Sequence, residues 1–133
     1  MTQVTKNLGQ HILAEFYECD PDKLNDVSFL EKTFNDAANL ADATIVKSVF
    51  HPFSPVGVTG VVVIMESHIS IHTWPEFGYA AVDFFTCSDQ MNYQKAYNYL
   101  VEILESKKHF AEKVERGLQK HLTLTHLNDN FIK

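Results

Sequence analysis

The sequence predicts an α+β fold in which a mainly antiparallel sheet carries two helices on one face. Three observations lead to this fold class. Six runs predict strands, among them an approximate alternation of apolar and polar residues at 8–18 and a β-branched and aromatic run at 44–51. Two other segments repeat apolar residues at the three- and four-residue steps of a helix. The order along the chain is one strand, a helix, four strands, a second helix and a last strand, so helices do not separate most of the strands.

The first half of the chain predicts two strands and one helix. Residues 8–18 mix apolar and polar side chains in approximate alternation, which is typical of a strand. Asp20 and Pro21 supply a capping side chain and a proline at the first helical position, so we expect the helix to begin there. Its apolar stripe consists of Val27, Leu30, Phe34, Ala37, Ala38 and Ala41. Residues 44–51 predict the second strand, and two prolines and a glycine within 52–57 predict a loop.

Three further strands follow with short connections. Residues 59–65 and 69–74 predict the third and fourth strands of the chain. After a turn at 75–78, residues 79–85 predict the fifth.

The end of the chain predicts a second helix and a last strand. Ser88 or Asp89 is suited to cap the helix. The apolar stripe of this helix consists of Tyr93, Ala96, Tyr97, Leu100, Val101 and Leu104. Residues 108–114 predict the last strand, and from Gly117 onward the periodicity is too weak to assign a structure.

One face of the predicted sheet is too aromatic to be left in water. Side chains alternate across a strand, so Ile69 and Ile71 point to one face. The opposite face of this strand and the next carries His68, Ser70, His72, Trp74, Tyr79, Ala81, Asp83, Phe85 and Cys87. Two helices cover only one face of the sheet, and we therefore expect a second copy of the chain to pack on the other.

Length, charge and cysteine content exclude several classes of protein. The chain fits a single domain, 1–133, with its own core. No apolar run approaches the roughly 20 residues of a membrane span, and residues 1–7 lack the apolar core of a signal peptide, so we expect a cytoplasmic protein. The net charge of -6 and the scattered Lys and Arg residues argue against nucleic-acid binding. Cys19 and Cys87 are too few for a disulfide framework and predict free thiols.

The most unusual stretch is a turn with reactive side chains. Apolar runs at 61–64 and 69–71 are joined by almost no residues, so they must form a tight hairpin. The sequence Glu66-Ser67-His68 lacks the glycine or asparagine that such turns prefer. We therefore expect this turn to be strained.

Two generic chemistries fit this stretch poorly. His68 and His72 have the spacing of a zinc pair on a helix, but four residues of a strand span about 13 Å, too far for both to bind one ion. The sequence therefore predicts no metal site. A Ser-His-acid hydrolase would need a Gly-x-Ser-x-Gly turn around Ser67 and a carboxylate behind His72, and neither is evident.

The same stretch carries a resemblance to a known family. The sequence ESHISIHTWPE at 66–76, followed by GYAAVD at 78–83 and FTC at 85–87, resembles the bacterial and archaeal S-adenosylmethionine decarboxylase proenzymes. The resemblance also takes in 9–20 and further short segments, and covers nearly all of the chain up to Gly117.

The resemblance implies a precursor that cleaves itself between Glu66 and Ser67 into a β chain, 1–66, and an α chain, 67–133. The Ser67 hydroxyl would attack the Glu66 carbonyl and convert the peptide bond to an ester, and elimination and hydrolysis would leave a pyruvoyl group. His72 would abstract a proton during the elimination. Strain in the turn would raise the energy of the amide relative to the ester.

The resemblance also implies an activity, the pyruvoyl-dependent decarboxylation of S-adenosylmethionine for spermidine and polyamine synthesis. The pyruvoyl group derived from Ser67 would form a Schiff base with the substrate amine and accept electrons as carbon dioxide leaves. Cys87 would return a proton to the α-carbon. Phe53 would stack on the adenine, and Glu76 would hold the ribose hydroxyls. The family is a dimer of processed pairs with two sites at the interface, in agreement with the second copy expected on the aromatic face.

Three positions depart from the family pattern. Thr59 stands where the family usually has a serine linked to processing, and its stiffer side chain predicts slower cleavage. Asp42 stands where glycine is frequent, and Pro52 where a basic residue is frequent. Two alternatives therefore stay open: a pyruvoyl-dependent arginine or ornithine decarboxylase, and an unprocessed, non-catalytic paralogue.

Overall fold

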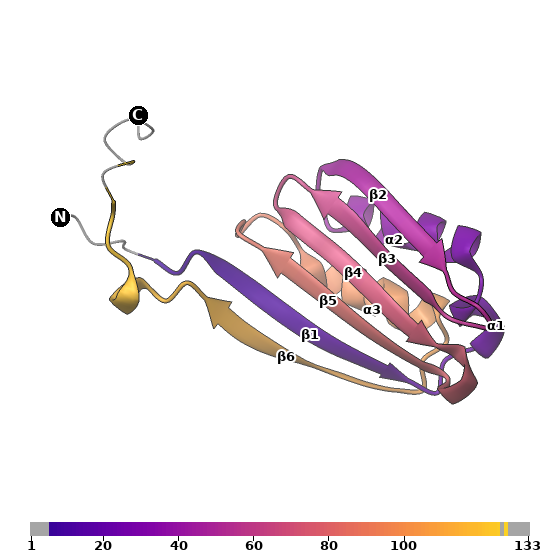
Figure 1. Cartoon of the computed structure of the whole chain (residues 1–133). Helices are drawn as coiled ribbons and strands as arrows, with labels where there is room; N and C mark the ends of the chain where they lie inside the picture. Colours follow the sequence, from indigo (N-terminus) through magenta and orange to yellow (C-terminus); the bar gives the residue numbers. More distant parts are fainter. Residues whose placement is uncertain (1–5, 126, 128–133) are drawn as a thin grey trace.

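The computed structural model describes residues 6–125 and 127, which form one six-stranded sheet with helices against one face (Figure 1). The strand order is β2-β3-β4-β5-β1-β6, and every neighbouring pair is antiparallel. The strands are β1 (Gly9–Tyr17), β2 (Ile45–Pro52), β3 (Val58–Ile64), β4 (Ser67–Trp74), β5 (Tyr79–Thr86) and β6 (Lys108–Arg116). This confirms the predicted fold class and all six strands. β4 begins two residues earlier than predicted, because Ser67 already pairs with Ile64.

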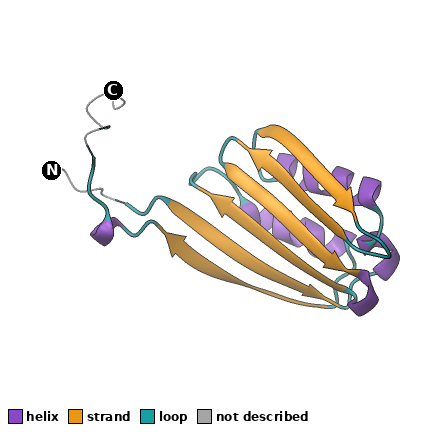
Figure 2. Ribbon diagram, in the orientation of Figure 1, coloured by secondary structure: helices purple, strands orange, loops and turns teal. Residues whose placement is uncertain are grey.

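Two long helices, α2 (Val27–Leu40) and α3 (Tyr93–Ile103), lie side by side over one face of the sheet (Figure 2). Shorter helical turns are α1 (Pro21–Leu24), η1 (Pro75–Phe77) and η2 (Gln119–His121). The last of these lies in the tail after Gly117, for which the sequence made no prediction.

The predicted caps were partly wrong. Asp20 caps a helix as predicted, but that helix, α1, ends at Leu24, and α2 begins separately after Asp26. The Asp26 carboxylate accepts a hydrogen bond from the Phe29 amide at 3.0 Å and so provides a second cap. The second predicted helix is capped by Asn92 instead of Ser88 or Asp89, which lie in the preceding loop. Side chains suited to capping occur at each of these places, and the apolar stripe alone does not decide between them.

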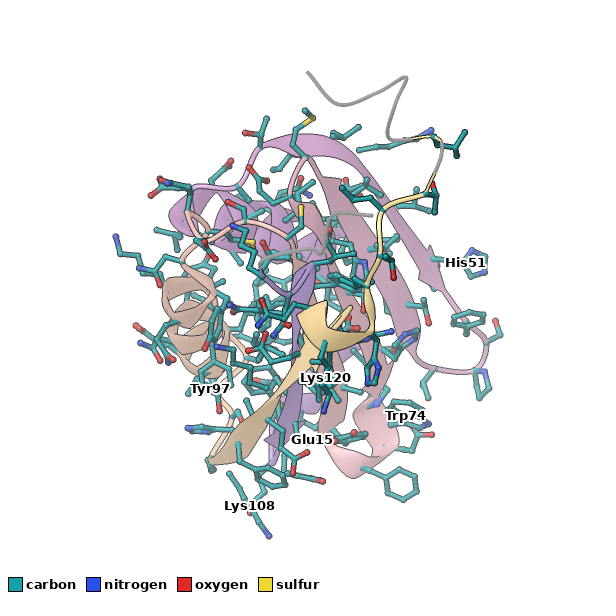
Figure 3. The ribbon with its side chains drawn as sticks, turned by 90° about the vertical axis from the view of Figure 1, so that its left-hand side faces the viewer. Glu15, His51, Trp74, Tyr97, Lys108 and Lys120 are labelled. Atoms are coloured by element: carbon teal, nitrogen blue, oxygen red, sulfur yellow. The ribbon has the colours of Figure 1, made fainter. Side chains whose placement is uncertain are left out.

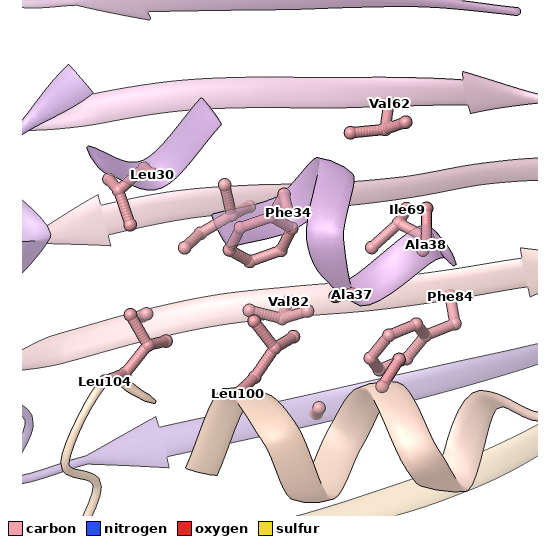
Figure 4. Close-up of a cluster of buried hydrophobic side chains, with 14 of the residues drawn as sticks. Leu30, Phe34, Ala37, Ala38, Val62, Ile69, Val82, Phe84, Leu100 and Leu104 are labelled. Atoms are coloured by element: carbon pink, nitrogen blue, oxygen red, sulfur yellow. The ribbon is translucent and has the colours of Figure 1, made fainter. Parts of the chain in front are cut away.

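The core lies between the sheet and the two long helices (Figure 4). Phe34 and Leu100 from the helices and Ile69 and Phe84 from the strands are fully buried there. The apolar stripes of both helices therefore face the alternate residues of the strands, as the periodicities predict.

The other face of the sheet, called the open face here, points away from the helices. It carries the alternate residues of β4 and β5 that the sequence assigned to it. A row of aromatic rings in contact crosses it: the Trp74 ring lies 5.4 Å from Tyr79, Tyr79 lies 5.1 Å from Tyr17, and Tyr17 lies 5.9 Å from Phe110. In Figure 3, Trp74 projects on the side away from the helix that carries Tyr97. Trp74 and Phe110 are 41% and 51% exposed, so this row is an apolar surface open to contact.

Asp42, where glycine is frequent in the family, lies in the turn that follows α2. Asp42 has a φ of 59°, the left-handed conformation that glycine adopts most easily. Aspartate tolerates this conformation better than most residues, so the turn into β2 is kept without glycine.

Candidate functional site

The predicted reactive turn is a two-residue hairpin connection. Met65 and Glu66 join β3 to β4, and Ser67 is the first residue of β4. Ser67 has a φ of 147°, in the positive range that only glycine adopts readily, at a typical cost of about 1–3 kcal/mol. The strain predicted from the sequence of this turn is thus located at the backbone of Ser67.

Glu66, the residue before Ser67, is held by two hydrogen bonds, one to its peptide carbonyl and one to its side chain. The backbone N–H of Cys87 donates to the carbonyl oxygen of Glu66 at 2.9 Å. The backbone N–H of Thr44 donates to the Glu66 carboxylate at 3.1 Å. A backbone donor at the carbonyl oxygen is placed to stabilise negative charge that develops there when a nucleophile attacks the carbonyl carbon. Glu66, Ser67 and Cys87 therefore form one group at the hairpin end of the sheet.

The remaining predicted residues gather at the opposite end of β4. Phe53, Thr59, His72 and Glu76 line one pocket of about 280 Å³. His72 lies opposite Thr59 in the β3–β4 pair, and the Thr59 hydroxyl is 3.1 Å from His72 Nδ1. Phe53 is 52% exposed, so its ring is free to stack on a ligand.

The two groups are far apart within one chain. Ser67 and His72 are five residues apart on the same strand, which corresponds to about 16 Å. His72 follows the strand alternation and points to the open face. A single chain therefore does not bring the predicted nucleophile and the predicted base together.

A polar cluster on the open face was missed in the sequence. Asp83 accepts hydrogen bonds from the Ser70 hydroxyl and from His11 Nε2, the latter at 2.6 Å, and its Oδ2 lies 3.5 Å from His68 Nε2. Arg116 donates to His11 Nδ1 at 2.8 Å. We call these five residues the Asp83 network. Strand alternation had placed three of them on one face, but the pairing of β1 with both β5 and β6 was needed to add His11 and Arg116.

The protonation of the Asp83 network follows from its donors. Burial alone would raise the pKa of Asp83, but the hydrogen bonds from His68, Ser70 and His11 outweigh it and hold the pKa of this carboxyl well below its usual range. Because Arg116 can only donate, His11 Nδ1 is an acceptor and Nε2 carries the hydrogen that points at Asp83.

The same network contains residue types that bind metals. The ligand atoms of His11, His68 and Asp83 lie within 4.8 Å of one another. A metal-bound histidine donates its second ring N–H to an acceptor, but His11 Nδ1 faces the donor Arg116. The hydrogen-bond order therefore favours a network of protein groups over an ion at this place.

Acid should remove the stabilisation that Asp83 provides. A carboxyl with a lowered pKa in the folded state stabilises the fold above its unfolded pKa of roughly 3.9, and this contribution is lost as the pH falls further. We expect the difference in unfolding free energy between the parent and Asp83→Asn to shrink below about pH 4. Urea titrations at neutral pH and in acid check this, and a difference independent of pH would contradict it.

The two thiols should differ in reactivity. Cys19 is buried, and burial raises the pKa of its thiol to about 11 despite a hydrogen bond with Ser106 that lowers it. Cys87 is exposed. Because the thiolate is the reactive form, we expect iodoacetamide to label Cys87 in the folded protein and Cys19 only after unfolding. Peptide mapping of the labelled sites tests this, with Cys87→Ser as the control.

In the described part of the chain, no helix has the length and apolar character needed to cross a membrane.

Comparison with known proteins agrees with the resemblance seen in the sequence. The sequence model of the S-adenosylmethionine decarboxylase family matches residues 10–117. The S-adenosylmethionine decarboxylase proenzyme of Thermosipho africanus (strain TCF52B) is 55% identical over 103 residues, which are 77% of this chain and 79% of that protein.

Further relatives extend the match. The proenzyme of the same name from Thermotoga maritima is 51% identical over 112 residues, 84% of this chain and 86% of that protein. The crystal structure of the adenosylmethionine decarboxylase from Aquifex aeolicus VF5 superposes with a TM-score of 0.80 at 39% identity, covering 91% of this chain and 100% of that one. With the fold, the strained hairpin and these matches in agreement, the chain belongs to the S-adenosylmethionine decarboxylase family.

Proposed function

We propose that this chain is the precursor of a pyruvoyl-dependent S-adenosylmethionine decarboxylase that cleaves itself between Glu66 and Ser67. The observation that carries the proposal is the strained Ser67, whose preceding carbonyl accepts a hydrogen bond from the Cys87 amide. The reaction proposed is the one for which the family is named, the decarboxylation of S-adenosylmethionine. The decarboxylated product would be the aminopropyl donor for spermidine and other polyamines.

Cleavage would proceed at this carbonyl. The Ser67 oxygen attacks the Glu66 carbonyl carbon while a base takes the hydroxyl proton, and the Cys87 N–H stabilises the oxyanion. The Glu66–Ser67 C–N bond breaks, leaving an ester on the Ser67 oxygen and a free amino group on Ser67. Removal of the Cα proton then expels the Glu66 carboxylate, and water replaces the nitrogen as ammonia to leave the pyruvoyl group. Release of the backbone strain at Ser67 favours the ester.

The residues present fit a pyruvoyl enzyme, because the serine that would supply the group is strained and its carbonyl is held. When formed, the pyruvoyl group supplies the electron sink for loss of carbon dioxide. Phe53 and Glu76, which share a pocket, would bind the adenine and the ribose hydroxyls. The Cys87 thiol, exposed beside Glu66, would protonate the α-carbon.

We propose further that each site is built from two copies of the chain. Ser67 and Cys87 lie about 16 Å from His72 and its pocket in one chain, so His72 of the partner subunit would act on Ser67. A two-fold dimer through the open face would place the pocket of each copy against the hairpin of the other. The exposed aromatic row on the open face supports this interface.

The pocket also bears on the alternative substrates. Arginine and ornithine carry no adenosine, and a decarboxylase for either would have no use for a stacking ring and a ribose-binding carboxylate at Phe53 and Glu76. Release of labelled carbon dioxide from S-adenosylmethionine, arginine and ornithine, each labelled in its carboxyl group, tests the assignment. We expect release from S-adenosylmethionine alone, and release from either amino acid would replace the substrate while leaving the pyruvoyl chemistry in place.

A further inference from the structure

His68 occupies a special position in a cleaved chain. Its backbone nitrogen would form the amide that carries the pyruvoyl group, so the placement of His68 sets the placement of the reacting ketone. The His68 ring lies on the open face, 34% exposed, with Nε2 at 3.5 Å from Asp83 Oδ2. It also packs on the Phe85 ring at 5.7 Å and meets the His11 ring edge to face at 6.2 Å.

Asp83 is itself held from several strands. Ser70 of β4 donates to Oδ1, and His11 of β1 donates to Oδ2. Arg116 of β6 fixes the tautomer of His11 and lies over the Phe85 ring at 5.4 Å. The carboxylate is therefore held directly from the two strands that flank β5, and by Arg116 of β6 through His11, before it meets His68.

The cleavage and decarboxylation steps described above make no use of Asp83. The pocket at the far end of β4 and the hairpin account for the substrate, the nucleophile and the proton donor. The five groups of the Asp83 network contact one another, and one of them is the residue that would bear the pyruvoyl group. This arrangement is suited to holding the His68 ring in one orientation.

We propose that Asp83 is a positioning residue that acts through the His68 ring to hold the pyruvoyl end of the α chain in its reactive orientation. The proposal rests on the proposed self-cleavage at Ser67. Misplacement of a reacting group by about 1 Å can cost on the order of a hundredfold in rate, so a lost support should act mainly on kcat. Substrate binding through Phe53 and Glu76 should change little, because neither Asp83 nor His68 lines that pocket.

A double-mutant cycle separates positioning from general destabilisation. The chains compared are the parent, Asp83→Asn, His68→Gln and the double variant, with kcat expressed per cleaved chain. We expect each single variant to lower kcat about tenfold or more, to leave KM within about twofold, and to be as slow as the double variant. Effects of the two substitutions that multiply, a change confined to KM, or an unchanged kcat in Asp83→Asn would overturn the proposal.

Controls address folding and charge. Glu112→Gln removes another carboxylate from the open face, on β6 opposite Leu13, and should keep the parent kcat. Should Asp83→Asn fail to fold, Ser70→Ala removes one support of Asp83 and enters the same cycle with His68→Gln, with a smaller effect of the same kind expected.

The half-time of chain cleavage is measured on the same variants. Ser67 precedes His68 in the precursor as well, so cleavage should show the same lack of additivity. If the parent cleaves but releases no carbon dioxide from S-adenosylmethionine, the substrate assignment fails and the cycle on cleavage still tests Asp83. If the parent does not cleave, both proposals are wrong.

Discussion

A chain carrying Ser67→Ala is expected to stay one uncut polypeptide and to lose all decarboxylation of S-adenosylmethionine. Alanine has no hydroxyl to attack the Glu66 carbonyl, so neither the ester nor the pyruvoyl group forms. Intact mass under denaturing conditions should show two fragments of roughly half size for the parent, with a blocked N-terminus on the second, and a single species for the variant.

Met65→Ala is the matched control for this experiment. It alters the exposed neighbour of Glu66 in the same hairpin but leaves the hydroxyl in place, and it should still cleave. A parent protein that stays uncut would support the unprocessed paralogue. Thr59→Ser would then be compared, since faster cleavage with serine would trace the defect to Thr59, whose hydroxyl contacts His72.

Two inactive chains are expected to restore each other when they are co-expressed. Ser67→Ala lacks the nucleophile and His72→Ala lacks the base. In the proposed dimer, Ser67 of one copy meets His72 of the partner subunit, so one site of each mixed dimer holds both wild-type residues. Random mixing makes about half of the dimers mixed, and about a quarter of the parent activity should return. Carbon dioxide release, together with cleavage of a tagged His72→Ala chain, measures this.

The double variant, Ser67→Ala with His72→Ala, distinguishes the two possible arrangements. If each site uses both copies, a mixed dimer of this chain with the parent has no complete site. If each site lies within one chain, the same dimer keeps one, and the two single variants never restore activity. An absence of recovery with the single variants, in dimers shown to be mixed, would therefore refute the shared site.

The fold was predictable because the periodic patterns are strong and agree with one another. Alternation in β4 and β5 assigned each side chain to the correct face, and the helical stripes marked α2 and α3. The helix starts were less predictable, because Asp20 and Asp26 are both suited to capping and only tertiary packing ends α1 at Leu24.

The site was predictable only in part. The family motif named the residues, and the unfavourable turn sequence indicated strain at Ser67. The large distance between Ser67 and His72 follows from the assignment of both residues to one strand, whereas the family motif alone does not reveal it. The Asp83 network could not be predicted from the sequence, because it depends on the position of β1 between β5 and β6. No local sequence pattern reveals that strand order.

Cleavage at the tip of the β3–β4 hairpin would leave two fragments whose strands are interleaved in one sheet. Fragment 1–66 contains β1, β2 and β3, and fragment 67–133 contains β4, β5 and β6. In the sheet, β1 of the first fragment lies between β5 and β6 of the second, while β3 remains paired with β4 (Figure 1). The fragments would share their ladders of backbone hydrogen bonds and one core, so we expect that dilution would not separate them without unfolding of the sheet. The precursor would thus lose a peptide bond between two central strands and still unfold as one unit.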